Sequence, residues 1–231
     1  MKSTETVFHI YDSLPTLHKT LAYKVARDLD AAIAAKGSAS LLLSGGNTPR
    51  PFLVQLAAEN VDWSRVTVGL VDERWVDPES GASNENLVRS ELLANGAEAA
   101  TFVGMYRPGE TAAEAVVGVE AAYKAFFPFD VVVLGMGSDG HTASLFPGRP
   151  ELEGLLNGAA LCGAAEAPTE PKERMSLSLH AIASAAHCYL HIEGGAKLAV
   201  YEAALDGDDV DIMPVRAVLN HPDIALEVFY A

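Results

Sequence analysis

The chain has 231 residues, of which 31 are acidic and 16 are basic, so its formal net charge at pH 7 is −15. This balance argues against nucleic acid or an anionic membrane as the main partner, because both need a basic face. With 49% apolar residues and only two cysteines, the chain can bury a sizeable core without a disulfide framework. We expect a single domain that spans residues 1–231.

The N-terminal segment MKSTETVFHIYDS contains no long apolar region. No apolar run elsewhere approaches the roughly 18 residues that a membrane helix needs. The sequence therefore predicts a cytoplasmic protein with no membrane partner.

Apolar periodicity predicts strands that alternate with helices along most of the chain. Strands are expected at residues 6–11, 40–43, 66–71, from 130, and at 174–179, 188–192 and 224–229. Helices are expected at about 15–35, from Pro49, at 86–93, 111–126 and 195–205. This alternation predicts an α/β fold with a mostly parallel sheet.

The stretch from Phe129 to Gly148, FDVVVLGMGSDGHTASLFPG, concentrates the candidate chemistry. Its run VVVL is short and rich in β-branched residues, which indicates a strand buried on both faces. Three glycines follow and allow a sharp turn close to a ligand. Ser138, Asp139 and His141 lie in that turn. Ligands of open α/β sheets bind at the carboxyl ends of strands, so we expect the chemical centre here.

Other interpretations of this stretch are weaker. Gly135 to Gly140 satisfies the dinucleotide pattern G-x-G-x-x-G, but Pro147 cuts the following helix short and no acidic residue stands about 20 positions on. The serine-hydrolase pattern G-x-S-x-G fails because Met136 replaces its first glycine. A purely structural histidine is the remaining alternative, and the neighbouring Asp139 and glycines count against it.

A second polar segment lies between the expected strand at 40–43 and the helix from Pro49. Its residues are Ser44, Gly45, Gly46, Asn47 and Thr48. Glycine amides, two hydroxyl groups and a helix N-terminus suit a phosphate group. An ordinary strand-to-helix turn explains the same residues equally well, because the Walker pattern is absent.

Charged residues mark three further places. Asp72, Glu73 and Arg74 stand where a strand should end; Asp72 and Arg74 suit a sugar-sized ligand, whereas Glu73 suits a structural ion pair. Arg174 and Lys197 are either surface charges or counter-charges for a phosphate.

The segment HCYLH contains a histidine–cysteine cluster that resembles a metal site only in composition. On a strand, His187 and His191 face one side and Cys188 faces the other. We interpret these residues as core and edge positions.

Three motifs together resemble the 6-phosphogluconolactonase family. They are LLLSGGNTP at residues 41–49, VDERWV at 71–76 with Asn84 and Asn86 after it, and LGMGSDGHTASLFPG at 134–148. The third motif is specific, whereas the first two are shared with the related glucosamine-6-phosphate deaminases. The resemblance implies a Rossmann-like sheet with helices on both faces.

The resemblance also implies hydrolysis of 6-phospho-D-glucono-1,5-lactone in the oxidative pentose phosphate pathway. His141 would be the general base, a role that suits the ordinary pKa of an imidazole, and Asp139 would orient the ring or the water. The remaining implied residues bind substrate. Those expected at the phosphate are Ser44, Gly45, Gly46, Arg174 and Lys197, with Asn47 and Thr48 in the same loop, and those at the sugar are Asp72 and Arg74. Neither a metal nor an organic cofactor is expected, and the family suggests a monomer or homodimer.

Two alternatives stay open. The deaminases carry a glutamate shortly after the histidine, whereas this chain reads ASLFP at residues 143–147, which favours the lactonase. The lead-in Pro171-Lys172-Glu173 is less proline-rich than is usual for lactonases, which weakens the phosphate role of Arg174. A non-catalytic sugar-phosphate-binding protein is the second alternative, and the pairing of His141 with Asp139 counts against it.

Overall fold

The computed structural model describes residues 6–231. The expectation drawn from the N-terminal segment falls partly on residues 1–5, which lie outside this range. Among the described helices, none is both long and apolar enough to cross a membrane.

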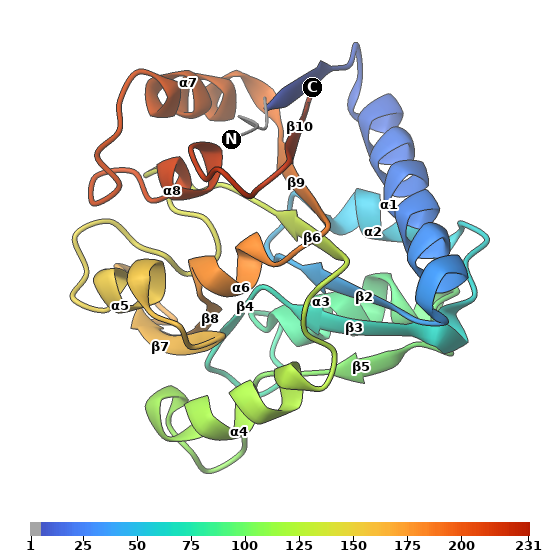
Figure 1. Cartoon of the computed structure of the whole chain (residues 1–231), viewed down its shortest axis with the longest axis horizontal. Helices are drawn as coiled ribbons and strands as arrows, with labels where there is room; N and C mark the ends of the chain where they lie inside the picture. Colours follow the sequence, from blue (N-terminus) through green and yellow to red (C-terminus); the bar gives the residue numbers. More distant parts are fainter. Residues whose placement is uncertain (1–5) are drawn as a thin grey trace.

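A seven-stranded parallel sheet forms the centre of the molecule, as expected for an α/β fold (Figure 1). In spatial order its strands are β1 (Val7–Ile10), β10 (Leu226–Tyr230), β9 (His187–Ile192), β6 (Val131–Leu134), β2 (Ala39–Leu43), β3 (Val66–Leu70) and β5 (Thr101–Val103). Every residue of β2 and β6 is buried, because helices cover both faces of the sheet there.

Helices pack on both faces of this sheet. In chain order they are α1 (Leu14–Lys36), α2 (Arg50–Ala57), α3 (Asn84–Glu91), α4 (Ala112–Lys124), α5 (Leu152–Asn157), α6 (Leu179–Ala183), α7 (Gly194–Leu205) and α8 (Val215–Leu219), with short 3₁₀ turns η1 (Trp63–Arg65) and η2 (Leu93–Asn95). α1 packs against α2 and β2 on one face, whereas α7, α8 and α6 pack together on the other (Figure 1).

Helix boundaries follow local capping chemistry. α1 begins after Ser13, whose side chain accepts a hydrogen bond from the Thr16 amide, and ends at Gly37, which takes a left-handed φ of 85°. α3 begins at Asn84, two residues earlier than expected, because Ser83 accepts a hydrogen bond from the Asn86 amide at 3.1 Å and caps the helix.

β2 and β6 are neighbouring strands, and the strands that follow them in the chain are added to the sheet in opposite directions. After β2 the chain proceeds outward to β3 and β5, and after β6 it proceeds the other way to β9 and β10. The loops that follow β2 and β6 therefore diverge at their carboxyl ends and leave a crevice between them. Such a switch point is where open α/β sheets bind ligands.

A small antiparallel sheet stands beside this crevice, and the sequence analysis did not anticipate it. Its strands are β4 (Asp72–Arg74), β8 (Glu173–Leu177) and β7 (Cys162–Glu166). The residues expected at the end of the third strand thus form a strand of their own. The strand expected at 174–179 belongs to this second sheet and ends at Leu177, because Ser178 caps α6. Five further elements were not predicted from the sequence: β5, β7, α5, α6 and α8.

Candidate active site

A cavity of about 440 Å³ opens at the switch point. Ten of the eleven candidate site residues line it: Ser44, Gly45, Gly46, Thr48, Asp72, Arg74, Asp139, His141, Arg174 and Lys197. Asn47 is the exception, because its exposed side chain lies on a smaller neighbouring hollow of about 100 Å³ that it shares with Gly46 and Arg74. The fold therefore gathers residues that are up to 153 positions apart in the chain.

The loop after β6 holds His141 against Asp139. The Asp139 carboxylate Oδ1 lies 2.5 Å from Nδ1 of the imidazole and 3.2 Å from the His141 amide nitrogen. Burial alone would raise the pKa of Asp139, but the hydrogen bonds and charge of His141 outweigh burial and lower it to about 2. When Asp139 is charged, it accepts a hydrogen bond from the protonated Nδ1 of a neutral His141 ring. The lone pair of Nε2 is then free to accept a proton.

Glycine is required inside this loop. A Cβ on Gly137 would overlap with the imidazole of His141 and crowd the Asp139 carboxylate. Ala143, two residues after His141, holds a positive φ of 52°, which costs a non-glycine residue roughly 1–2 kcal/mol. The loop thus keeps a strained backbone where it lines the cavity, as functional loops often do.

The loop after β2 presents unused hydrogen-bond donors to the cavity. Within residues 6–231, the amides of Gly45, Gly46, Asn47 and Thr48 donate to no protein acceptor. The Ser44 hydroxyl accepts from the Gly135 amide at 3.3 Å, which leaves its own proton for a ligand. This arrangement can hold an anion.

Asn84 fixes the position of the β2 loop. A Cβ on Gly45 would overlap with the Asn84 side chain, whose Nδ2 donates to the backbone carbonyl of Asp72 at 2.8 Å. Gly45 therefore serves close packing as well as ligand approach.

Antiparallel pairing of β4 with β8 brings two arginines together. Arg74 lies opposite Arg174, and Asp72 lies opposite Ser176, so these side chains share the face of the small sheet that borders the cavity. Arg174 is 7% exposed, and its Nε has no hydrogen-bond partner within the described residues. Burial lowers the pKa of Arg174, while the charge of Asp72 opposes that shift. A buried guanidinium with an unused donor is suited to an anionic ligand.

Two residues that the sequence analysis did not single out complete this wall. The buried Ser144 donates to the Asp72 carboxylate at 2.6 Å and orients it. The Phe146 ring is tilted by 53° relative to the His141 ring, with centroids 4.8 Å apart, and its centroid lies 6.0 Å from the Arg174 guanidinium carbon. Both residues follow His141 closely, but their spacing did not indicate that Phe146 lines the cavity or that Ser144 bonds to Asp72.

Glu73 is structural, as expected, but it forms no ion pair in the described part of the chain. It points away from the cavity side of β4 and is fully buried. Its two oxygens accept hydrogen bonds from the amides of Arg74, Asn84 and Glu85 and from the Ser83 hydroxyl, at 2.7–3.0 Å. Burial raises the pKa of Glu73 to about 7, against the effect of these four donors. The carboxyl group ties β4 to the N-terminus of α3.

Lys197 reaches the cavity from the first turn of α7. Its ammonium donates to the backbone carbonyl of Met136 at 2.7 Å, which links α7 to the loop after β6. Burial lowers its pKa, and the negative charge of Asp139 opposes this shift. The cation therefore stands between the histidine loop and the start of α7.

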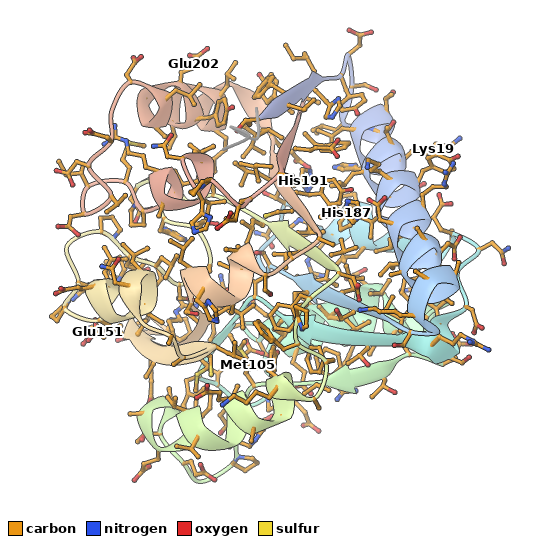
Figure 2. The ribbon with its side chains drawn as sticks, in the orientation of Figure 1. Lys19, Met105, Glu151, His187, His191 and Glu202 are labelled. Atoms are coloured by element: carbon orange, nitrogen blue, oxygen red, sulfur yellow. The ribbon has the colours of Figure 1, made fainter. Side chains whose placement is uncertain are left out.

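His187 and His191 of β9 lie on one side of the strand, as its periodicity predicted, and that side faces α1. His187 lies 3.7 Å from Asp28 of α1, and the His191 ring centroid is 5.6 Å from that of His18. Figure 2 labels His187 and His191 on the part of the molecule next to α1. His191 and Glu193 line the cavity, and the sequence analysis assigned neither of them to the site.

The chain is similar to proteins of one family over almost its whole length. Residues 12–226 match the family model of glucosamine-6-phosphate isomerases and 6-phosphogluconolactonases. A 6-phosphogluconolactonase of Pseudomonas putida is 48% identical over 209 residues, which are 90% of this chain and 86% of the relative. One of Rhizobium meliloti (strain 1021) is 44% identical over 230 residues, covering 96% of this chain and 97% of the relative.

A crystal structure of a 6-phosphogluconolactonase from Shewanella baltica superposes on the chain with a TM-score of 0.95 at 45% identity. The match covers 99% of this chain and 98% of the other. The chain therefore belongs to the family of glucosamine-6-phosphate isomerases and 6-phosphogluconolactonases, as an enzyme of the lactonase kind.

Proposed function

We propose that the chain hydrolyses 6-phospho-D-glucono-1,5-lactone to 6-phospho-D-gluconate, with His141 as the general base. The observation that carries this proposal is the His141–Asp139 pair, which faces a cavity whose other walls carry Arg174, Lys197 and the open β2 loop. His141 can act as a proton acceptor at one side of the cavity, and Arg174, Lys197 and the β2 loop can bind an anion at the other. This arrangement suits a lactone that carries a phosphate group at the end remote from its carbonyl.

In the proposed reaction, Nε2 of His141 takes a proton from a water molecule as its oxygen attacks the lactone carbonyl C1. Collapse of the tetrahedral intermediate then breaks the bond between C1 and the ring oxygen, and the His141 imidazolium gives its proton to that departing oxygen. The Asp139 carboxylate holds the opposite ring nitrogen at 2.5 Å and stabilises the imidazolium that forms. The developing oxyanion needs a donor. The Gly137 and Gly140 amides already bond within their loop, and the β2-loop amides hold the phosphate in this proposal, so the Ser138 amide of the histidine loop is the better candidate.

Substrate binding in this proposal divides between two groups of residues. The β2-loop amides, the hydroxyls of Ser44 and Thr48, and the cations Arg174 and Lys197 hold the phosphate. Asp72 and Arg74 bind the sugar hydroxyls. Ser144 keeps Asp72 directed toward the cavity through its 2.6 Å hydrogen bond.

The deaminase alternative would need a second acid–base group beside His141. Residues 143–147 supply none, and Ala143 and Phe146 line the cavity where such a group would act. An apolar wall suits lactone hydrolysis, in which one base and one water suffice.

The test is proton release from freshly generated 6-phosphogluconolactone, with the spontaneous rate subtracted. We expect a large acceleration that survives exhaustive EDTA treatment, because no step above uses a metal. The same preparation should release no ammonia from glucosamine 6-phosphate. Ammonia release without lactone hydrolysis would replace the proposal with the deaminase reaction, and inactivity toward both would leave a binding protein.

A further inference from the structure

A cluster of two histidines and one glutamate lies between α1 and β9, and two of its residues line the cavity. His18 Nε2 is 2.7 Å from Oε1 of Glu193, and His191 Nε2 is 2.9 Å from the same oxygen. His18 and His191 are 6% and 3% exposed. No role in the lactonase reaction proposed above falls to these residues.

The hydrogen bonding of this cluster is incomplete. His18 makes a hydrogen bond to Glu193, but neither ring nitrogen of His191 makes a well-aligned one within residues 6–231. Buried polar atoms of this kind are uncommon, and an ion absent from the coordinates is one of their ordinary explanations. Phe52 packs edge-on against the His191 ring at 6.1 Å, so this side offers no polar substitute.

We infer that His18, His191 and Glu193 form a binding site for one divalent transition-metal ion of the zinc class. One donor atom from each residue lies within 4.8 Å of the others. Zinc bonds to imidazole nitrogen and carboxylate oxygen are about 2.0–2.2 Å long, so side-chain shifts of about 1 Å bring the three donors around one ion. Two nitrogens and one oxygen form a donor set that zinc accepts.

The protonation states of the cluster suit a metal ion. Burial lowers the pKa of His191, which favours the neutral ring that a metal requires. Burial would raise the pKa of Glu193, but the two histidines outweigh burial and lower it, so the carboxylate stays charged.

The site has an entry path from the substrate cavity. His191 and Glu193 line the cavity, whereas His18 closes the cluster from the α1 side. A tetrahedral ion held by three protein ligands keeps a fourth position, which here faces the cavity and takes a water molecule or an anion. This inference goes beyond the proposed function and does not depend on it.

The experiment is a titration of the EDTA-treated full chain with Co²⁺, followed by the visible absorption of tetrahedral cobalt and by competition with Zn²⁺. We expect one saturable equivalent that Zn²⁺ displaces. His18→Gln and His191→Gln should each weaken binding at least about tenfold, since even outer-shell changes cost that much. His187→Gln, on the same strand but outside the cluster, is the matched control and should bind like the wild type.

Two further variants separate other outcomes. His141→Ala should retain Co²⁺ binding, because His141 does not belong to the cluster; loss of binding there would move the ion to the catalytic pair and overturn the inference. Glu193→Gln should weaken binding while keeping a side chain of the same shape, and circular dichroism of the metal-free variants confirms that they fold. Absent saturable binding, or equal binding by the wild type and both histidine variants, would also overturn it.

Discussion

His141 is held by a residue two positions away, whereas Arg174 reaches the same cavity by pairing with a residue 100 positions earlier in the chain. The first contact belongs to one loop between β6 and Pro147. The second depends on a small antiparallel sheet and on the Glu73 hydrogen bonds that anchor it. The reacting group is thus built locally, while the binding wall is assembled by the tertiary fold.

This difference predicts which changes alter chemistry and which alter folding. The loop after β6 is expected to keep its conformation when one of its side chains is removed. The binding wall formed by β4 and β8 depends on contacts between several elements. Removing one buried group there is expected to destabilise all the elements that contact it.

The largest effect is expected from His141→Ala. Turnover of the phosphorylated lactone should fall by about 10²–10⁴, the usual range for removing a general base, with a small change in KM. The free energy of unfolding should change little, because the ring is partly exposed. His180→Ala, at an exposed position of α6 outside the cavity, is the control. Near-normal turnover in His141→Ala would remove the histidine from the mechanism.

Glu73→Gln should cost stability rather than chemistry. Four donors point at the two carboxylate oxygens, and an amide would place its own N–H groups against two of them. We expect a loss of roughly 2–4 kcal/mol in the free energy of unfolding, measured by urea denaturation. Glu79→Gln, exposed on the same segment, is the matched control. Equal stability of the two variants would show that β4 needs no such anchor.

Arg174→Ala tests the binding wall itself. Hydrogen bonds to charged groups contribute about 1.5–3 kcal/mol, so KM for the phosphorylated lactone should rise about 10–100-fold. Unphosphorylated gluconolactone should be little affected, because it lacks the group that Arg174 is proposed to hold. Arg27→Ala, on the exposed face of α1, controls for loss of positive charge. If KM rises equally for both lactones, Arg174 supports the structure and does not bind the phosphate.

The same contrast in range explains what could be read from the sequence. The loop after β6 was predictable because its strand, glycines and polar residues lie within 20 positions. The β4–β8 ladder was not, because Asp-Glu-Arg is a polar segment of three residues with no apolar alternation of its own. Its strand conformation comes from pairing with Arg174 and Ser176 and from the burial of Glu73.

Glu193 and His191 were missed for a related reason. His191 lies within a strand and Glu193 lies at the start of a helix, and neither position forms part of a recognisable motif. They become neighbours of His18 only when β9 packs against α1. Spacing within one segment drew attention to His187, Cys188 and His191. Only His191 belongs to the cluster, and its partners His18 and Glu193 lie outside that segment.

The smallest predicted effect is the pH dependence contributed by Asp139. Its pKa is about 2 in the folded protein and has a reference value of 3.8, so the folded state favours the charged form. The resulting stabilisation is complete above pH 3.8 and is lost as the pH falls through about 2. Because the side chain is 38% exposed, solvent screening limits this contribution to about 1 kcal/mol. Asp139→Asn should therefore be less stable than the wild type at pH 7 in urea titrations, and the gap should close toward pH 2. A gap that is constant across this range would mean that the His141–Asp139 contact orients the ring without stabilising the fold.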